Sequence, residues 1–187
     1  MLIAILLENT LLTRALGTST VILILRKKAN YFLFCTVLTF ITLLSSLAVY
    51  FMNPLIEASS YAYYIRPIMY VAIISVLYLV VLLIVGRFPK EFRQKIQPMI
   101  HLSVFNCAVL GAILLASSLP LTLFTAIGFG LGSGIGFFLA TFLLAGSYRY
   151  LNSDNIPLFF RGFPITMIFV GILSLALYGV IGHQLPV

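Results

Sequence analysis

Charged residues, tryptophan and cysteine are scarce in this sequence of 187 residues. Only 8% of the residues are Asp, Glu, Lys or Arg, tryptophan does not occur, and there are two cysteines. A soluble globular domain carries roughly a quarter of its residues as charged side chains, so the composition excludes such a domain. Two cysteines are also too few for the disulfide framework of a small secreted protein.

Reactive polar side chains are equally few. The four acidic residues and two histidines form no Ser/His/Asp, paired-carboxylate or zinc-binding pattern along the chain. We therefore expect no catalysis by the chain alone. His101 and His183 lie near the ends of apolar segments, where interfacial hydrogen bonding is the expected role of both.

Long apolar runs fill the sequence instead. Hydrophobic residues make up 62% of the chain, and its mean hydropathy is +1.17. Six segments remain when the chain is cut at charges, prolines and polar clusters: about 1–25, 30–52, 67–86, 97–117, 121–146 and 164–182. Each can cross a hydrocarbon layer of about 30 Å as a helix. We expect an all-α integral membrane protein with six transmembrane helices in one domain, 1–187. The first segment lacks the basic start and cleavage site of a signal peptide, so we expect it to be retained.

Basic residues alternate between the connections of these segments. Of the 11 Lys and Arg residues, nine fall in alternate connections: Arg26, Lys27 and Lys28; Arg87, Lys90, Arg93 and Lys95; Arg149 and Arg161. Short basic loops stay in the cytoplasm, so both termini are expected outside. The net charge of +7 is thus a topology signal and does not indicate a nucleic-acid partner.

An odd number of spans in each half predicts an inverted repeat, with halves of about 1–86 and 97–182. Such folds keep their functional polar groups where matched helices are interrupted near the middle of the membrane. The first and fourth segments are the most polar, so we expect both to be interrupted, with Asn9 and Asn106 at the two breaks.

Two charges fall within the first segment. Glu8 and Arg14 are six residues apart, which does not make an i,i+4 ion pair, and a charge at the centre of a membrane helix costs about 2.5–3.5 kcal/mol. Both are candidates for an ion path or an electrostatic role. Alternatively, Glu8 lies at the outer surface and Arg14 reaches the interface along its own stem.

Glycines recur in the fifth segment. Gly128, Gly132 and Gly136 form one stripe, and Gly130 and Gly134 form another on roughly the opposite face. No strand precedes this run and no Lys-Ser/Thr pair follows it, so a phosphate-binding loop is excluded. Small-residue stripes predict close packing between membrane helices.

Three motifs carry a resemblance to a known family. They are Asn9-Thr-Leu-Leu-Thr-Arg-Ala-Leu-Gly17 with the basic run after it, Asn106-Cys-Ala-Val-Leu-Gly111, and Phe160-Arg-Gly162. Together they resemble the Rnf/Nqr family of membrane electron-transport subunits over essentially the whole chain. The resemblance is to the branch with A-type subunits of Rnf and E-type subunits of the sodium-pumping NADH:quinone reductase.

This resemblance implies a homologous, oppositely oriented partner subunit. The two subunits would share an iron–sulfur cluster at mid-membrane, held by a cysteine from each broken helix, and electron flow through it would be coupled to Na⁺ or H⁺ movement. Cys107 occupies one family cysteine position. At the other, the family has cysteine followed by proline, whereas this chain has Ser19 followed by Thr20.

Serine is a far poorer iron ligand than a thiolate, so three explanations remain open. The cluster persists with Ser19 or another ligand, or Cys35 substitutes for the missing thiolate, or the metal has been lost. Arg14 would then neutralise an anionic centre or gate an ion.

The resulting hypothesis is a membrane subunit of an Rnf/Nqr-like redox complex in a prokaryotic cytoplasmic membrane. The alternative is a substrate-binding membrane component of a small-molecule importer, which would have similar length, basicity and outward-facing polar residues. A third interpretation is a structural helper that completes a membrane complex.

Overall fold

A computed structural model of the chain describes residues 9–27, 30–57, 61–117, 122–153 and 156–181. Within these ranges it contains seven α-helices and no strand. They are α2 (Thr18–Arg26), α3 (Tyr31–Glu57), α4 (Ala62–Gly86), α5 (Lys90–Val104), α6 (Cys107–Ala116), α7 (Leu123–Leu151) and α8 (Phe163–Ile181). The expected all-α class is therefore confirmed.

The apolar helices have the lengths of membrane spans. α3, α4 and α7 are each long and apolar enough to cross a bilayer, and α5 and α6 form one further span that is bent by 53° at its break. α8 is a shorter apolar helix, and α2 is a half-length helix of nine residues. The chain is thus a multi-pass membrane protein, and the interruption expected in its fourth segment is present.

Prolines do not end these helices, contrary to the expected boundaries. α3 continues through Pro54 to Glu57, and α4 begins at Ala62 and continues through Pro67. A proline removes one backbone hydrogen bond, but neighbouring groups in membrane helices readily satisfy the carbonyl that is freed. Both helices are consequently longer than the apolar segments from which they were predicted.

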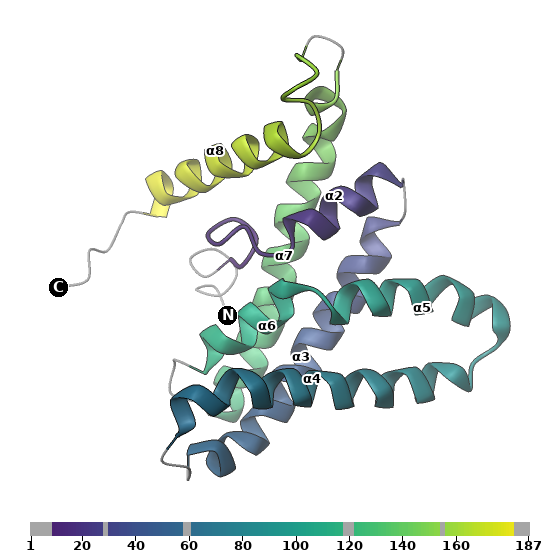
Figure 1. Cartoon of the computed structure of the whole chain (residues 1–187), viewed down its shortest axis with the longest axis vertical. Helices are drawn as coiled ribbons and strands as arrows, with labels where there is room; N and C mark the ends of the chain where they lie inside the picture. The colour runs from purple at the N-terminus through teal and green to yellow at the C-terminus, as the bar shows by residue number, and fades with distance from the viewer. Residues whose placement is uncertain (1–8, 28–29, 58–60, 118–121, 154–155, 182–187) are drawn as a thin grey trace.

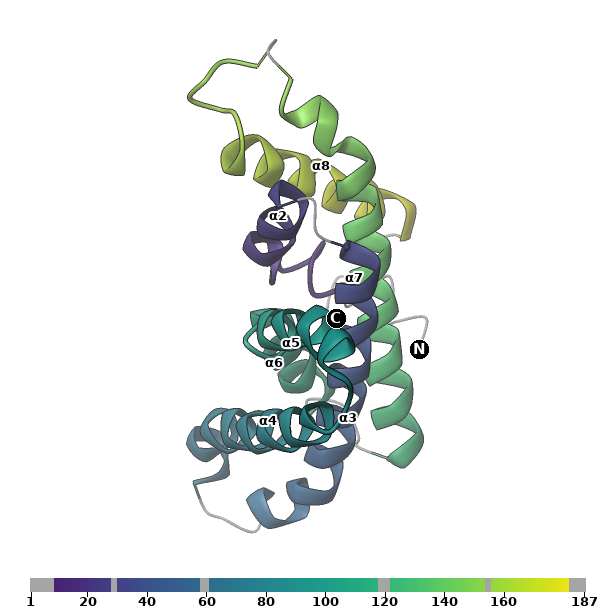
Figure 2. The ribbon, with the colours of Figure 1, turned by 90° about the vertical axis from the view of Figure 1, so that its right-hand side faces the viewer.

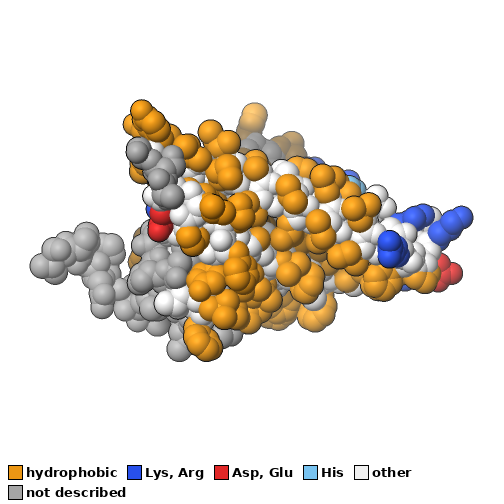
Figure 3. Space-filling view, turned by 90° about the horizontal axis from the view of Figure 1, so that it is seen from below, with side chains coloured by type: hydrophobic (Ala, Val, Ile, Leu, Met, Phe, Trp, Pro, Cys, Tyr) orange, Lys and Arg blue, Asp and Glu red, His pale blue; other side chains and the backbone are white. Residues whose placement is uncertain are grey.

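The connection expected at 87–96 is mostly helical as well. α5 begins at Lys90, directly after Pro89, so three of the four basic residues of this connection lie on its first turns. Figure 3 shows Lys and Arg side chains gathered at one tip of the molecule, beyond a surface of hydrophobic side chains. The separation of charge from apolar surface matches a helix pair that emerges from the membrane at this tip.

Two long helices form the central layer. α3 and α7 lie side by side, α4 and α5 run across them on one side, and α2 and α8 lie toward the other end (Figures 1 and 2). A Cβ atom added to Gly130 would lie 3.0 Å from Leu43 Cα, and one added to Gly134 would lie 2.7 Å from Thr39 Cα. The glycines of this stripe thus allow backbone contact with α3.

Hydroxyl groups complete the α3–α7 interface. Thr42 Oγ1 donates a hydrogen bond of 3.2 Å to the carbonyl of Gly130, and Ser46 Oγ donates one of 2.8 Å to the carbonyl of Ala126. Such interhelical hydrogen bonds are a recurrent means of joining helices in lipid, where the hydrophobic effect gives no driving force. In the other glycine stripe, Gly132 and Gly136 are buried and Gly128 is half-buried.

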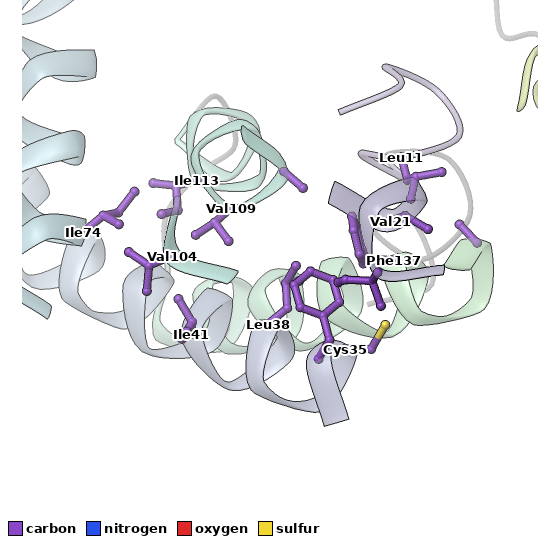
Figure 4. Packing of buried hydrophobic residues seen from close by; sticks show 14 of the residues in the cluster. Leu11, Val21, Cys35, Leu38, Ile41, Ile74, Val104, Val109, Ile113 and Phe137 are labelled. Atoms are coloured by element: carbon purple, nitrogen blue, oxygen red, sulfur yellow. The ribbon is translucent and has the colours of Figure 1, made fainter. Parts of the chain in front are cut away.

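The buried apolar side chains meet where the broken span crosses the central pair. In Figure 4, Val104 of α5 and Val109 and Ile113 of α6 point toward Leu38 and Ile41 of α3. In the same view, the ring of Phe137 on α7 lies beside Leu38. This packing holds the break between α5 and α6 in a fixed place.

Candidate functional site at the two helix breaks

The first apolar segment is non-helical over residues 9–17, which lie mostly in turns, and α2 begins only at Thr18. Residues 9–17 are called the first break. Asn9 is buried, and its Oδ1 accepts hydrogen bonds from the backbone N–H groups of Leu11 (3.1 Å) and Leu12 (3.2 Å). Its Nδ2 donates to the carbonyl of Gly136 on α7 at 2.9 Å. The Asn9 side chain thus satisfies backbone groups that an unbroken helix would have paired internally.

The turn that leads into α2 needs left-handed backbone conformations. Ala15 has φ 55° and Gly17 has φ 81°, and the hydroxyl of Thr18 donates to the carbonyl of Ala15 at 2.7 Å. Glycine adopts a positive φ freely, whereas alanine does so at a cost. A strained residue at a helix break is typical of functional sites.

The second break separates α5 from α6. Phe105 and Asn106 lie outside both helices, and Asn106 caps α6 by accepting the N–H of Ala108 at its Oδ1, 3.0 Å away. Asn106 is 3% exposed, and its Nδ2 has no hydrogen-bond partner among the described residues. Both asparagines expected at the breaks are therefore there, and each accepts the N–H two residues along the chain.

The two breaks touch each other. The backbone N–H of Gly17 donates to Cys107 Sγ at 3.1 Å. A Cβ atom on Gly17 would lie 2.6 Å from Asn106 Oδ1, and one on Gly111 would collide with the side chain of Leu16. The amino-terminal ends of α2 and α6 consequently adjoin, and the partial positive charge at the two helix N-termini favours a negatively charged group between them.

Cys107 and Ser19 are both accessible at these helix ends. Cys107 is the first residue of α6 and Ser19 the second residue of α2, and both side chains are exposed. No group of three or more His, Cys, Asp or Glu that could hold a metal ion occurs within the described residues.

Cys35 lies in another part of the molecule. It is fully buried on α3 and borders a cavity of about 380 Å³ between α3 and α7. Cys107 borders a different cavity, of about 230 Å³, together with Ser75, Phe105 and Asn106. The structure therefore does not bring the two thiols into one cavity.

Of the two charged candidates in the first segment, the structure describes one. Arg14 is exposed on the turn before α2. Glu8 lies outside the described residues. The structure thus places Arg14, Asn9, Ser19, Asn106 and Cys107 on the two segments that meet at the breaks.

One polar contact was not anticipated from the sequence. His101 is half-buried on α5, and its Nδ1 lies 2.7 Å from the hydroxyl of Tyr78 on α4. We expected an interfacial role for His101, and nothing in the local spacing points to a partner 23 residues away. The contact arises because α4 and α5 pack against each other.

The sequence matches the family described as "Rnf-Nqr subunit, membrane protein" over residues 1–183. It is 29% identical to the A-type subunit of the ion-translocating oxidoreductase complex of Syntrophotalea carbinolica over 179 residues, 96% of this chain and 93% of the relative. It is 28% identical to the A-type subunit of the Na(+)-translocating ferredoxin:NAD(+) oxidoreductase complex of Acetobacterium woodii, over 99% of this chain and 96% of the relative. A match of 32% identity to the E-type subunit of the Na(+)-translocating NADH-quinone reductase of Rhodopirellula baltica covers 63% of this chain and 55% of the relative.

Proposed function

Because this chain belongs to the Rnf-Nqr family of membrane subunits, we propose that it carries electrons across a membrane as part of an ion-translocating oxidoreductase complex. Two relatives that match nearly its whole length are named as A-type subunits of such complexes. The complex is expected in a prokaryotic cytoplasmic membrane, with both termini of this chain outside. A homologous subunit of opposite orientation, bound beside this chain, belongs to the same proposal.

The contact between Gly17 and Cys107 carries this proposal. It places an exposed cysteine at the junction of two helix breaks, where a partner surface has access to the sulfur. Soft thiolate sulfur is the ligand that iron–sulfur clusters require, and hydrogen bonds to that sulfur tune the reduction potential. The N–H of Gly17 is such a donor.

The donor set at this place fits a cluster shared with a partner subunit, because the described residues offer one thiolate here. Cys107 would supply that thiolate, and Ser19 would supply a hydroxyl at the end of the adjoining half-helix. The partner subunit would supply the remaining ligands. When bound, the cluster would accept and release single electrons.

Other residues of the two breaks would stabilise a negatively charged group at this place. Asn9 stabilises the turn that precedes α2 and Asn106 caps α6, and the partial positive charge at the N-termini of these helices would offset negative charge on the sulfur ligands. Arg14 on the neighbouring turn adds a positive charge, which would favour an anionic centre or guide the Na⁺ or H⁺ to which electron flow is coupled.

Iron content and low-temperature EPR of the complex, purified with its co-expressed neighbours, test this proposal. We expect reducible iron in the wild-type complex, loss of the signal in Cys107→Ala, and an unchanged signal in the matched variant Cys35→Ala. Iron that persists in Cys107→Ala would remove the metal assignment. An intact complex without iron, even after anaerobic reconstitution, would overturn the redox role and favour a transport or structural one.

A further inference from the structure

Two cavities lie along the seam between α4 and α5. The first, of about 570 Å³, is bordered by Arg93 and Gln97 of α5 and by the last turns of α4. It adjoins the basic tip, which is the connection 87–89 together with the first turns of α5 that contain Lys90, Arg93 and Lys95. The second is the cavity of about 230 Å³ that contains Asn106 and Cys107.

Tyr78 and His101 lie between the residues that border the two cavities. His101 is four residues after Gln97 and four before Phe105, so it lies on the same face of α5 as both. Tyr78 is three residues after Ser75, which borders the inner cavity, and four before Leu82, which borders the outer one. The hydrogen bond between Tyr78 and His101 therefore joins α4 to α5 about one helical turn from residues that border each cavity.

Aromatic packing fixes the pair in this position. The ring of Tyr78 meets the ring of Phe105 edge-on, with centroids 5.3 Å apart, while its hydroxyl lies 2.7 Å from His101 Nδ1. Phe105 is the first residue of the break that leads to Cys107. The pair is thus linked by one ring contact to the break itself.

An ionisable side chain within a membrane span is expensive and calls for a partner or a function. We propose that Tyr78 and His101 form a protonatable gate between the outer cavity, with Arg93 and Gln97, and the inner cavity, with Asn106 and Cys107. A proton from water in the outer cavity would bind to His101 and bring a positive charge one turn closer to the break.

The change at His101 involves one proton and no electron. In the neutral imidazole with hydrogen on Nε2, Nδ1 accepts the O–H of Tyr78. When the ring gains a proton, both nitrogens are donors, and Nδ1–H donates to the oxygen of Tyr78, whose own O–H turns away. Loss of the proton reverses both steps.

In the described part of the chain, Tyr78 is the hydrogen-bond partner of the His101 side chain, and the other titratable groups of the packed helices lie farther away or make contacts elsewhere. On α5, Lys95 and Arg93 are about two turns away, and Lys90 and Glu91 are farther along the helix. On α4, Tyr70 donates to Asn53, Arg66 binds Glu57, and the rings of Tyr63 and Tyr64 pack on each other. The third packed helix, α3, has four titratable residues that make contacts elsewhere: Tyr31 borders a cavity with Arg26 and Arg149, Cys35 borders one with α7, Tyr50 packs on Phe51, and Glu57 binds Asn53 and Arg66.

Protonation of His101 does not depend on the proposed redox role. The use of that proton to compensate the charge of electrons does rest on the proposed function. If electrons arrive at the break, a proton held at His101 would compensate their charge from the side of the basic tip. The experiment therefore begins with the chain alone, where no electron transfer is required.

Nitrogen-15 NMR of histidine-labelled chain in phospholipid nanodiscs tests the gate directly. The sequence contains two histidines, so His183→Gln assigns the signals. We expect the His101 signals to show a hydrogen-bonded Nδ1 and a reversible gain of one proton when the folded chain is acidified. A ring that stays neutral throughout such an acid series would overturn the proposal.

The variant Tyr78→Phe distinguishes a gate in which Tyr78 binds His101 from a histidine that is bonded only to water. This variant keeps the ring packing but removes the hydroxyl, so the Nδ1 signal and its pH dependence should both shift, while the matched variant Tyr63→Phe, on an exposed face of α4, should leave them unchanged. Identical spectra for Tyr78→Phe and wild type would overturn the pairing.

In the assembled complex, proton uptake on reduction gives the second readout. We expect His101→Gln to lose the uptake that pH-indicator dye detects in wild type, with the iron EPR signal retained. Unchanged uptake would overturn the role in charge compensation. A complex without electron transfer would instead refute the proposed function and leave the NMR result as the test of the proton site.

Discussion

The nitrogen of Gly17 lies 3.1 Å from the sulfur of Cys107, although 90 residues separate them in the chain. This contact joins the end of an irregular turn to the first residue of a half-helix. Neither segment could hold such a conformation alone in a membrane, because unpaired backbone groups are costly in hydrocarbon. Each break therefore depends on the other and on the two asparagines that cap them.

Gly17→Ala should destabilise the complex by about 1–3 kcal/mol. The new Cβ would lie 2.6 Å from Asn106 Oδ1, and alanine is strained at a φ of 81°. Thermal dissociation of the purified complex would measure the effect. Gly171→Ala is the control, since a Cβ there meets nothing within 4 Å, and equal melting temperatures for the two variants would contradict the packing described here.

Asn9→Ala should cost about 3 kcal/mol, since each buried polar group left without a partner costs about 1–3 kcal/mol. The variant removes the acceptor for two N–H groups and the donor to the Gly136 carbonyl. Asn30→Ala provides the comparison, because exposed Asn30 accepts one hydrogen bond, of 3.3 Å. A similar loss of thermal stability in both would argue against a special role for Asn9.

Gly134→Ala should weaken the α3–α7 interface by about 1–3 kcal/mol. Its Cβ would approach both the side chain of Thr39 and, at 2.7 Å, the Cα of that residue. Thr39→Ala should therefore fail to rescue the variant, because the backbone contact remains. Gly146→Ala on the same helix meets nothing within 4 Å and should melt like wild type; rescue by Thr39→Ala would show that only side chains collide.

Ser19→Cys should raise the iron content of the complex and the intensity of its EPR signal, because a thiolate replaces a hydroxyl that gives up its proton poorly. The double variant with Cys107→Ala should lose that gain. Metal analysis of complexes prepared anaerobically provides the measurement. Should Cys107→Ala lower the iron content and Ser19→Cys leave it unaltered, position 19 would not be a ligand position.

The breaks could be foreseen because their cause is local. Asn106 follows a polar stretch in an apolar run, and the structure has the bend there. Asn9 likewise marks the turn before α2. In both cases, a side chain that competes for backbone hydrogen bonds indicates by itself where a membrane helix stops.

Contacts between elements that are distant in the sequence could not be predicted from such local patterns. The spacing of the α7 glycines predicts the two stripes. It does not predict that Gly134 contacts Thr39, or that the Gly136 carbonyl accepts a hydrogen bond from Asn9. The partner of His101 was missed for the same reason, because it depends on how α4 packs on α5. Proline positions misled the prediction of helix ends, since Pro54 and Pro67 lie within helices.

The crossing of the long helices has a consequence for the surrounding lipid. α3 and α7 contain 27 and 29 residues, which at about 1.5 Å per residue gives roughly 40 Å each, well beyond the 30 Å of a typical hydrocarbon core. Because α4 and α5 run across this pair, no single membrane normal is parallel to all four helices. At least one of the two pairs must therefore cross the bilayer obliquely, and α3 and α7 have the length to do so. Since packing between helices sets their inclination, a bilayer of different thickness would have to adapt to this crossing by thinning or thickening around the protein.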